Sequence, residues 1–262
     1  MRSDEEYEQI LRLWEGGENK LVIARVTGIP RATVRDCITR YGSVAGLKRQ
    51  RGLAKNGLPN GLSSTLCDPA NTQVQSAYAY LLGLYLGDGE ISRNRQIFRL
   101  RVALDKKYPD IIQSCAEAIE TVLPGHQVGI LDRPGCVNVS CYYKFWPNVF
   151  PQDGEGRKHE REIRLEPWQQ QIVEAYPLAF FRGLYHSDGS RFSNVVNGKD
   201  YPRYSFTNRS EAICRMFYDT CDRLGLHWTV KRRHSGRDTA TDIFISRRND
   251  VAYLDRVVGP KS

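Results

Sequence analysis

The chain has 262 residues, a formal net charge of +8 and an isoelectric point of about 9.1. This length suits one large domain or two smaller ones, and the basic balance favours an anionic partner, most simply nucleic acid. No stretch is long and apolar enough to cross a membrane, and the polar N-terminus is unlike a signal peptide. Seven cysteines without a CxxC pair predict reduced thiols in a cytoplasmic protein and no zinc site.

Residues 1–42 predict a small all-α domain of three short helices. The first helix has Ile10, Leu11 and Trp14 on one face, and two glycines end it. A Gly-Ile-Pro turn separates the second helix from the third. The expected bounds of the three helices are about residues 5–15, 19–27 and 31–41.

The second and third of these helices fit the pattern of a helix-turn-helix unit. Such units have a small residue, a turn glycine and an aliphatic residue at fixed offsets, and Ala24, Gly28 and Val34 match them. Alanine lets the helices approach, glycine accepts a positive φ, and valine fills the gap. The third helix would then read DNA near its N-terminal end, with Arg31, Thr33 and Arg35. A small helical dimerisation or regulatory module is the alternative.

Between residues 43 and 76 the periodicity fades, and glycine, proline, serine, asparagine and basic residues dominate. This composition predicts a basic linker. Two roles are open for it: a segment that follows a phosphate backbone, or a solvated hinge that contacts nothing.

Two similar stretches organise the rest of the chain: LLGLYLGDG at residues 81–89 and FRGLYHSDG at residues 181–189. In each, two small residues are four positions apart and so share one helix face. Small residues on one face allow two helix backbones to approach closely. The pairs are Gly83 with Gly87 and Gly183 with Ser187.

Each stretch is interpreted as a helix that ends in a carboxylate. The glycines that follow, Gly89 and Gly189, are expected to stop the two helices. If the helices pack face to face, Asp88 and Asp188 lie side by side at one end of the pair.

Alternating residues after the first stretch predict half-buried strands with polar or basic open faces. In the strand at residues 96–104, apolar side chains alternate with Arg99 and Arg101. A helix at about residues 109–122 follows. Next comes a hairpin in which Asn138 and Ser140 face outward, and a short helix closes this half.

The same order returns after the second stretch. One strand carries Arg191, and a later strand carries Lys231 and Arg233 on one face. Ser210 is a suitable N-cap for the helix between them. Each half therefore reads helix-strand-strand-helix-strand-strand-helix.

The twin stretches resemble the LAGLIDADG motif of homing endonucleases, and the resemblance covers about residues 77–262. It implies an α+β fold of two pseudo-symmetric αββαββα halves, residues 77–160 and 161–262, whose sheets form a saddle on double-stranded DNA. Because both halves lie in one chain, a monomer with internal pseudo-two-fold symmetry suffices. Strand residues on the open faces would contact phosphates and bases, unless they are ordinary solvated side chains. These residues are Arg99, Arg101, Asn138, Ser140, Arg191, Lys231 and Arg233.

The resemblance also implies a catalytic site. In that family the eighth motif residue binds metal, which here gives Asp88 and Asp188 as catalytic ligands of Mg²⁺. Mg²⁺ keeps several waters and takes only one or two protein carboxylates. The family also places a basic residue after the fourth strand of each half. The matching residues are Lys158 and Lys261, which would stabilise charge or orient water.

The family often places a polar residue after the second strand to position water. Asp105 and Asn208 occupy similar places here. Together these matches to the family imply a Mg²⁺-dependent, site-specific double-strand DNA endonuclease.

Two alternatives stay open. The first is a transcription regulator that binds DNA on a LAGLIDADG scaffold without cutting it. The N-terminal helix-turn-helix favours this reading, whereas the two intact aspartates favour the enzyme. The second is an RNA maturase, against which the helix-turn-helix argues.

Overall fold

The computed structural model describes residues 3–233, 240–259 and 261. The chain divides into two compact units, Met1–Ser64 and Thr65–Ser262. Within the described ranges, no helix combines the length and the apolar character needed to cross a membrane.

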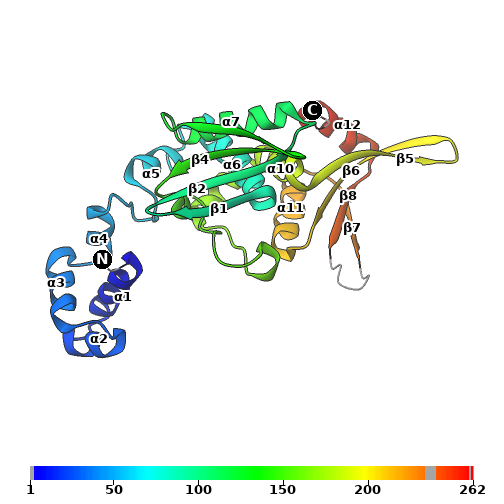
Figure 1. The fold of residues 1–262 in the computed structure, drawn as a ribbon. Helices are drawn as coiled ribbons and strands as arrows, with labels where there is room; N and C mark the ends of the chain where they lie inside the picture. The colour runs from blue at the N-terminus through cyan, green and yellow to red at the C-terminus, as the bar shows by residue number, and fades with distance from the viewer. Residues whose placement is uncertain (1–2, 234–239, 260, 262) are drawn as a thin grey trace. The chain divides into compact units, whose positions relative to one another are not determined.

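The first unit is helical and has its own apolar core. Ile10, Leu11, Ile23 and Val34 are fully buried in it. Trp14, expected on the core face, is 36% exposed instead, and the Lys20 ammonium lies 5.6 Å from its ring centroid. The helices are α1 (Asp4–Glu15), α2 (Lys20–Thr27), α3 (Arg31–Tyr41) and α4 (Val44–Gln50) (Figure 1).

The turn between α2 and α3 has the expected geometry. Gly28 ends α2 with φ +68°, a left-handed conformation that glycine adopts without steric cost. Val34 is fully buried, and Ala24 is partly buried against the same core. On α3, Arg31 and Arg35 are exposed and Thr33 is half-buried.

The segment expected as a basic linker contains regular structure. Helix α4 packs on α1 and α3, and its Leu47 is 1% exposed. Lys48 and Arg51 form ion pairs with acidic residues of α1. A further helix, α5 (Asn60–Leu66), spans the division between the units. A single buried leucine on α4 was too weak a periodic signal to reveal that helix in the sequence.

The second unit contains two halves with the expected order of elements. The first half has α6 (Thr72–Asp88), β1 (Gly89–Asn94), β2 (Ile97–Asp105), α7 (Pro109–Val122), β3 (Val128–Arg133), β4 (Cys136–Tyr143) and α8 (Trp146–Val149). The second half has α10 (Pro177–Asp188), β5 (Gly189–Val196), β6 (Lys199–Asn208), α11 (Glu211–Arg223), β7 (Trp228–Arg232), β8 (Thr241–Ile245) and α12 (Arg248–Val257). Between them lie a short 3-10 turn, η1 (Lys158–Glu160), and α9 (Pro167–Ala175).

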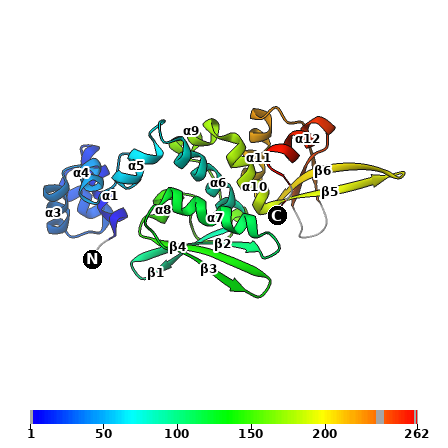
Figure 2. The same cartoon turned by 90° about the horizontal axis from the view of Figure 1, so that it is seen from above.

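Each half forms one four-stranded antiparallel sheet, and the two sheets share one topology. The strand orders are β1-β2-β4-β3 and β5-β6-β8-β7. Figure 2 shows α7 and α8 on one side of the first sheet, and α11 and α12 pack on the second in the same way. Leu100, Val102 and Val139 face the helices of the first half and are fully buried. The opposite face of each sheet carries no helix among the described residues.

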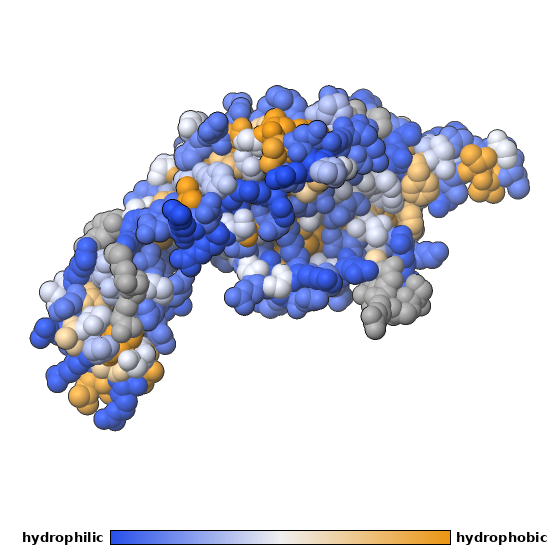
Figure 3. Space-filling model, in the orientation of Figure 1, coloured by the Kyte–Doolittle hydropathy of each residue, from blue (hydrophilic) through white to orange (hydrophobic). Residues whose placement is uncertain are grey.

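The β5–β6 hairpin extends beyond the helical layer (Figure 1). Asn197 and Gly198 form its turn with positive φ values of 49° and 76°. This dipeptide suits the two-residue turn of a twisted hairpin. Val195 and Val196 beside the turn are exposed, and Figure 3 shows an apolar patch at this end of the molecule's second unit.

The two halves meet along α6 and α10, where small residues allow very close contact. A Cβ added at Gly183 would lie 2.1 Å from the Tyr80 carbonyl oxygen. A Cβ added at Gly83 would lie 2.6 Å from the Leu184 backbone nitrogen. Neither position can hold a larger residue while the backbones stay where they are. The close packing predicted for these glycines is therefore confirmed.

Candidate active site at the paired helix ends

Asp88 and Asp188 are the last residues of α6 and α10, and close helix packing brings their carboxylates together. Gly87 is part of this arrangement. A Cβ at Gly87 would lie 2.7 Å from Asp188 Oδ2 and 2.2 Å from Ser187 Oγ. Glycine at this position therefore leaves room for the carboxylate of the other half.

The two helices end at the glycines after the aspartates, as expected, but by a different conformation from the usual left-handed one. Gly89 and Gly189 have extended backbones with φ −85° and −93°, so they do not end the helices in a left-handed conformation. Each helix passes directly into a strand. Glycine is needed here for space, because a Cβ at Gly89 or Gly189 would lie 2.5 Å from Tyr85 Cα or 2.3 Å from Tyr185 Cδ2.

Lys158 reaches the helix ends from η1, after the first half. Its Nζ donates hydrogen bonds to the carbonyl oxygens of Gly89, at 2.6 Å, and Tyr85. The Nζ also lies 4.5 Å from the centroid of the Tyr85 ring. Burial lowers the pKa of Lys158 to about 8, and the Asp188 and Asp88 carboxylates oppose this shift.

Lys261 plays the matching part after the second half. Its Nζ donates to the Ser187 carbonyl oxygen at 3.1 Å and lies 5.6 Å from the centroid of the Tyr185 ring. Burial lowers its pKa to about 8 as well, against the charges of Asp88 and Asp188. Asp188 acts more strongly on Lys158, and Asp88 acts more strongly on Lys261. Asp88 is affected more by Lys261 than by Lys158, but so is Asp188, so both lysines act on both carboxylates.

Burial and mutual repulsion make the carboxylate pair unfavourable. The pKa of Asp88 is raised to about 6, mainly by burial and then by the charge on Asp188, while Lys261 and Lys158 oppose the shift. Burial also raises the pKa of Asp188, while the hydrogen bond from Asn208 lowers it. Placing these two carboxylates side by side therefore lowers the free energy of unfolding at neutral pH.

We expect Asp88→Asn to increase stability at neutral pH. The pKa of Asp88 is higher in the folded than in the unfolded chain, so folding favours its neutral form. In the wild type, the contribution of neutral Asp88 to the free energy of unfolding is complete below about pH 4. It is lost as the pH rises through about 6. The variant should exceed the wild type by about 1–3 kcal/mol at pH 8. Urea unfolding in EDTA at pH 8 and pH 4 measures this. A difference that stays constant between the two pH values would contradict the assignment.

The two polar residues expected after the second strands are not equivalent. Asn208 Nδ2 donates to Asp188 Oδ2 at 2.8 Å, so this residue belongs to the site. Asp105 is exposed, and the backbone N–H and the ammonium of Lys107 both contact its carboxylate, at 3.1 Å and 2.9 Å. Lys107 lowers the pKa of Asp105. The structure therefore places Asp105 beside Lys107, with no hydrogen bond to Asp88.

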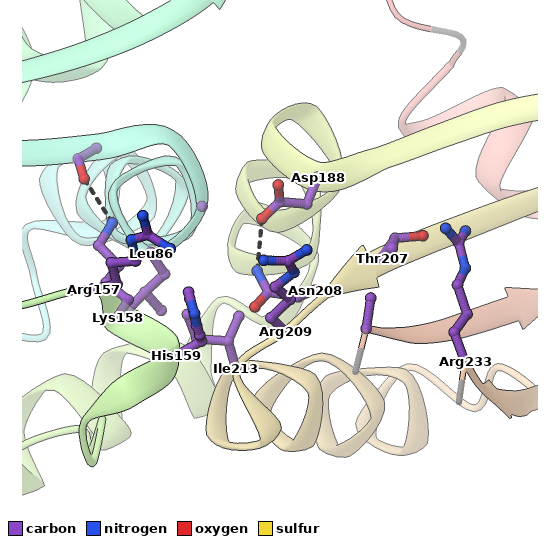
Figure 4. Close-up of a pocket in the computed structure, with 13 residues that line it drawn as sticks. Leu86, Arg157, Lys158, His159, Asp188, Thr207, Asn208, Arg209, Ile213 and Arg233 are labelled. Carbon is purple, nitrogen blue, oxygen red and sulfur yellow. Dashed lines mark hydrogen bonds between the residues drawn. The ribbon is translucent and has the colours of Figure 1, made fainter. Parts of the chain in front are cut away.

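A cleft of about 550 Å³ opens beside Asp188 (Figure 4). Lys158 and Asn208 line it together with basic residues that the sequence analysis did not single out. These are Arg157, His159 and Arg209. A cleft with Asp188 in its wall and a basic rim suits a phosphodiester whose negative charge is balanced at several points.

The first sheet presents its predicted DNA-contacting residues on the open face. Arg99 pairs with Tyr142 and Arg101 pairs with Ser140 across β2 and β4, so these side chains share one face. Arg101 also forms an ion pair with Glu90. Asn138 lies on this face but is only 7% exposed, because neighbouring strands shield it.

The second sheet departs from the expectation at one residue. Arg191 pairs with the buried Tyr204, so it lies on the helix-covered face, where it forms a bidentate ion pair with Asp255 at 2.6 and 2.8 Å. The strand begins at Gly189 itself, and this start decides the face on which Arg191 falls. Its assignment to the open face was therefore wrong.

Other basic residues do occupy the open face of the second sheet. Lys231 alternates with the helix-facing residues of β7, as expected. Arg233 binds the Asp242 carboxylate at 2.7 and 2.8 Å. Arg203, which the sequence analysis did not identify, pairs with Phe192 on the same face.

The donor set at the helix ends fits a hard divalent cation that keeps much of its water. The described residues include no group of three or more His, Cys, Asp or Glu side chains placed to hold a metal. Asp88 and Asp188 alone supply two carboxylates, the number that Mg²⁺ commonly takes from a protein. No described side chain donates a hydrogen bond to Asp88, so its oxygens are available to a cation.

Part of the second half matches a protein-family model by sequence. Residues 175–257 match the family model of LAGLIDADG-like domains. The matched segment runs from α10 to α12 and contains Asp188 and Asn208. The first half lies outside the matched range and is related to it by the same order of helices and strands.

Three solved structures are similar to this chain. Mesophilic variants of the homing endonuclease I-DmoI share 15% identity over 71% of this chain and 96% of theirs, with a TM-score of 0.49. I-DmoI in complex with DNA and Mn shares 15% identity over 71% and 97%, with a TM-score of 0.49. The N-terminal LAGLIDADG domain of DUF199/WhiA shares 12% identity over 77% and 90%, with a TM-score of 0.45. A comparison with curated proteins found no match.

Proposed function

We propose that the second unit is a two-half LAGLIDADG protein that hydrolyses both strands of a DNA duplex at one place. The observation that carries this proposal is the pairing of Asp88 and Asp188 at the ends of α6 and α10. Two half-buried lysines accompany them, one from each half. A helix pair that only joined two domains would gain nothing from two desolvated carboxylates that repel each other.

Each cut adds one water molecule across a phosphorus–oxygen bond and leaves a phosphate end and a hydroxyl end. Mg²⁺ held by Asp88 and Asp188 would neutralise the phosphate and activate the water. Lys158 and Lys261 would stabilise the negative charge that develops on the phosphate oxygens. Because both lysines act electrostatically on both carboxylates, each site would require both halves.

The open faces of the two sheets would hold the DNA. Arg99 and Arg101 on the first sheet, and Lys231 and Arg203 on the second, are suited to phosphates and guanine edges. Both halves lie in one chain, so we propose a monomer. Its target would be long and at most partly palindromic. Free thiols and a nucleic-acid target suit a cytoplasmic protein.

The experiment that tests this function separates binding from cutting. Duplexes that bind the protein in Ca²⁺ are recovered from a random-sequence library and are then transferred to Mg²⁺. Cleavage of the bound duplexes on transfer is the expected result. Tight binding without cleavage in Mg²⁺ or Mn²⁺ would overturn the proposal.

We further propose that the first unit is a helix-turn-helix that adds DNA contacts through α3. Replacing both Arg31 and Arg35 by alanine should weaken binding about 3- to 10-fold near physiological salt and reduce the salt dependence of the affinity. Binding titrations in Ca²⁺ at several salt concentrations measure this. The matched control is Arg12→Ala on α1, which removes an exposed arginine of the same unit. Equal effects of the two changes would contradict a reading role for α3.

The helical first unit also favours a second candidate, a transcription regulator that binds DNA without cutting. In that case Asp88 and Asp188 would be structural helix ends. The library experiment distinguishes the two, because a regulator would protect a defined sequence and leave its phosphodiester bonds intact in every metal.

A further inference from the structure

The two halves of the second unit have the same topology, yet among the described side chains one carboxylate has a hydrogen-bond donor and the other has none. The strand registers identify equivalent positions. Gly89 pairs with Val102, and Gly189 pairs with Phe206. Two residues further along, β2 has Leu104 and β6 has Asn208. These two residues thus occupy the same place relative to their helix ends.

Asn208 is fixed in an orientation that presents its N–H group to Asp188. Its Oδ1 accepts a hydrogen bond from the Ser210 backbone N–H at 2.7 Å. Ser210 in turn caps α11, since its hydroxyl accepts from the Ile213 backbone N–H. With the oxygen occupied, Nδ2 is the amide atom that faces Asp188, at 2.8 Å from Oδ2. A hydrogen-bonded carboxylate of this kind is held in one orientation before any ligand arrives.

The first half offers Asp88 no such support. Leu104 is apolar and 3% exposed, so it packs in the core of the first half. It stands at the position from which Asn208 donates a hydrogen bond to Asp188 in the second half. Asp105, the next residue, points to the open face and is engaged by Lys107. Among the described residues, none donates a side-chain hydrogen bond to the carboxylate of Asp88.

We propose that Asn208 is a positioning residue that makes the Asp188 site the faster of the two, so that one DNA strand is cut before the other. This inference rests on the proposed function. Each cut is the same hydrolysis, one water added across one phosphorus–oxygen bond, and the sites differ in how far their carboxylates are pre-oriented. The intermediate is a duplex nicked in one defined strand.

Strand-resolved single-turnover cleavage tests the inference. A duplex recovered from the random library is labelled differently on its two strands, bound by the full chain, and mixed with Mg²⁺. The test variant is Asn208→Ser. Serine keeps an oxygen that can accept from the Ser210 N–H, but its side chain is too short to reach Asp188. Thermal unfolding of the variant shows whether the fold is retained.

The wild type should nick one strand first. Asn208→Ser should lower the nicking rate of that same strand by about 10–100-fold, the usual effect of removing a partner of a metal-binding group. The other strand should keep its rate. The Mg²⁺ concentration that gives half-maximal nicking should rise for the affected strand alone. A general loss of structure would instead slow both strands and lower the unfolding temperature.

Equal nicking rates for the two strands in the wild type would overturn the inference. So would an Asn208→Ser variant whose nicking rate falls equally for both strands, or only for the strand that the wild type cuts second. A wild type that binds the duplex but cuts neither strand is a different result. It removes the proposed function, and with it the order of cutting that depends on it.

Discussion

Gly183→Ala should destabilise the second unit by about 3 kcal/mol or more, at the upper end of overpacking effects. The new Cβ would lie 2.1 Å from the Tyr80 carbonyl oxygen and 3.0 Å from Gly83 Cα. Both atoms belong to the backbone of α6, so no side-chain rotation relieves the contact. The helices must separate, and this separation would also move Asp88 away from Asp188. Urea unfolding of the second unit measures the loss.

The matched control for this substitution is Gly129→Ala in β3 of the same unit. There the nearest atoms to a new Cβ would be those of Ser140, at 3.7 and 3.8 Å, which is ordinary contact. Glycine within a strand is unfavourable by roughly 0.5–1 kcal/mol relative to alanine, so this change should be neutral or slightly stabilising. Similar stabilities for Gly183→Ala and Gly129→Ala would show that α6 and α10 are not in tight contact.

Asp188→Asn should abolish double-strand cleavage while DNA binding is retained. The amide keeps the size of the carboxylate but lacks the charge that would hold a divalent cation. We expect a loss of at least about 10²-fold, comparable to removing one charge-stabilising group from an active site. Binding should be equal or slightly tighter, because the change removes a negative charge that faces the phosphates. Asp88→Asn should behave in the same way.

The control here is Asp219→Asn on α11, an exposed aspartate in the helical layer. It should leave both cleavage and binding unchanged. Cleavage of the same duplexes in Mg²⁺, with binding measured in Ca²⁺, compares the three variants. Persistent double-strand cleavage by Asp88→Asn or Asp188→Asn would exclude the paired aspartates as the catalytic groups.

The parts of this fold that could be predicted are those that local sequence patterns determine. The twin motifs place Asp88 and Asp188 at helix ends, and the spacing of Gly83 and Gly183 specifies which helix faces meet. The alternation in β2 distinguishes the buried Leu100 from Arg99. Each of these inferences uses residues within one element, or the repetition of one element in the other half.

The parts that could not be predicted depend on register and on distant partners. Arg191 faces the helices because β5 begins at Gly189 and because Asp255, far along the chain, supplies its counter-charge. Asp105 and Asn208 look alike in sequence, since each ends the second strand of its half. The strand pairings show that Asn208 corresponds to Leu104 instead.

One missed element did carry a local signal. Helix α9 begins with Pro167 at its first position, and Glu166 with Gln169 forms a capping box there. Proline at a helix start followed by such a pair is a recognised start signal. Its Gln169 is fully buried and donates to the Tyr78 hydroxyl at 2.6 Å, so α9 helps to fix α6 in the second unit.

Under the proposed function, Asp88 and Asp188 together cut both strands of the duplex at one place. Sequencing the ends produced in Mg²⁺ from library duplexes tests it most directly. Because the two carboxylates lie together, the two broken bonds must also lie close together. Phosphates of opposite strands face each other across the minor groove, which is only about 6 Å wide. We expect two cuts on opposite strands, a few nucleotides apart, at one place in each duplex. Scattered ends, or a protected duplex that stays uncut, would contradict the claim.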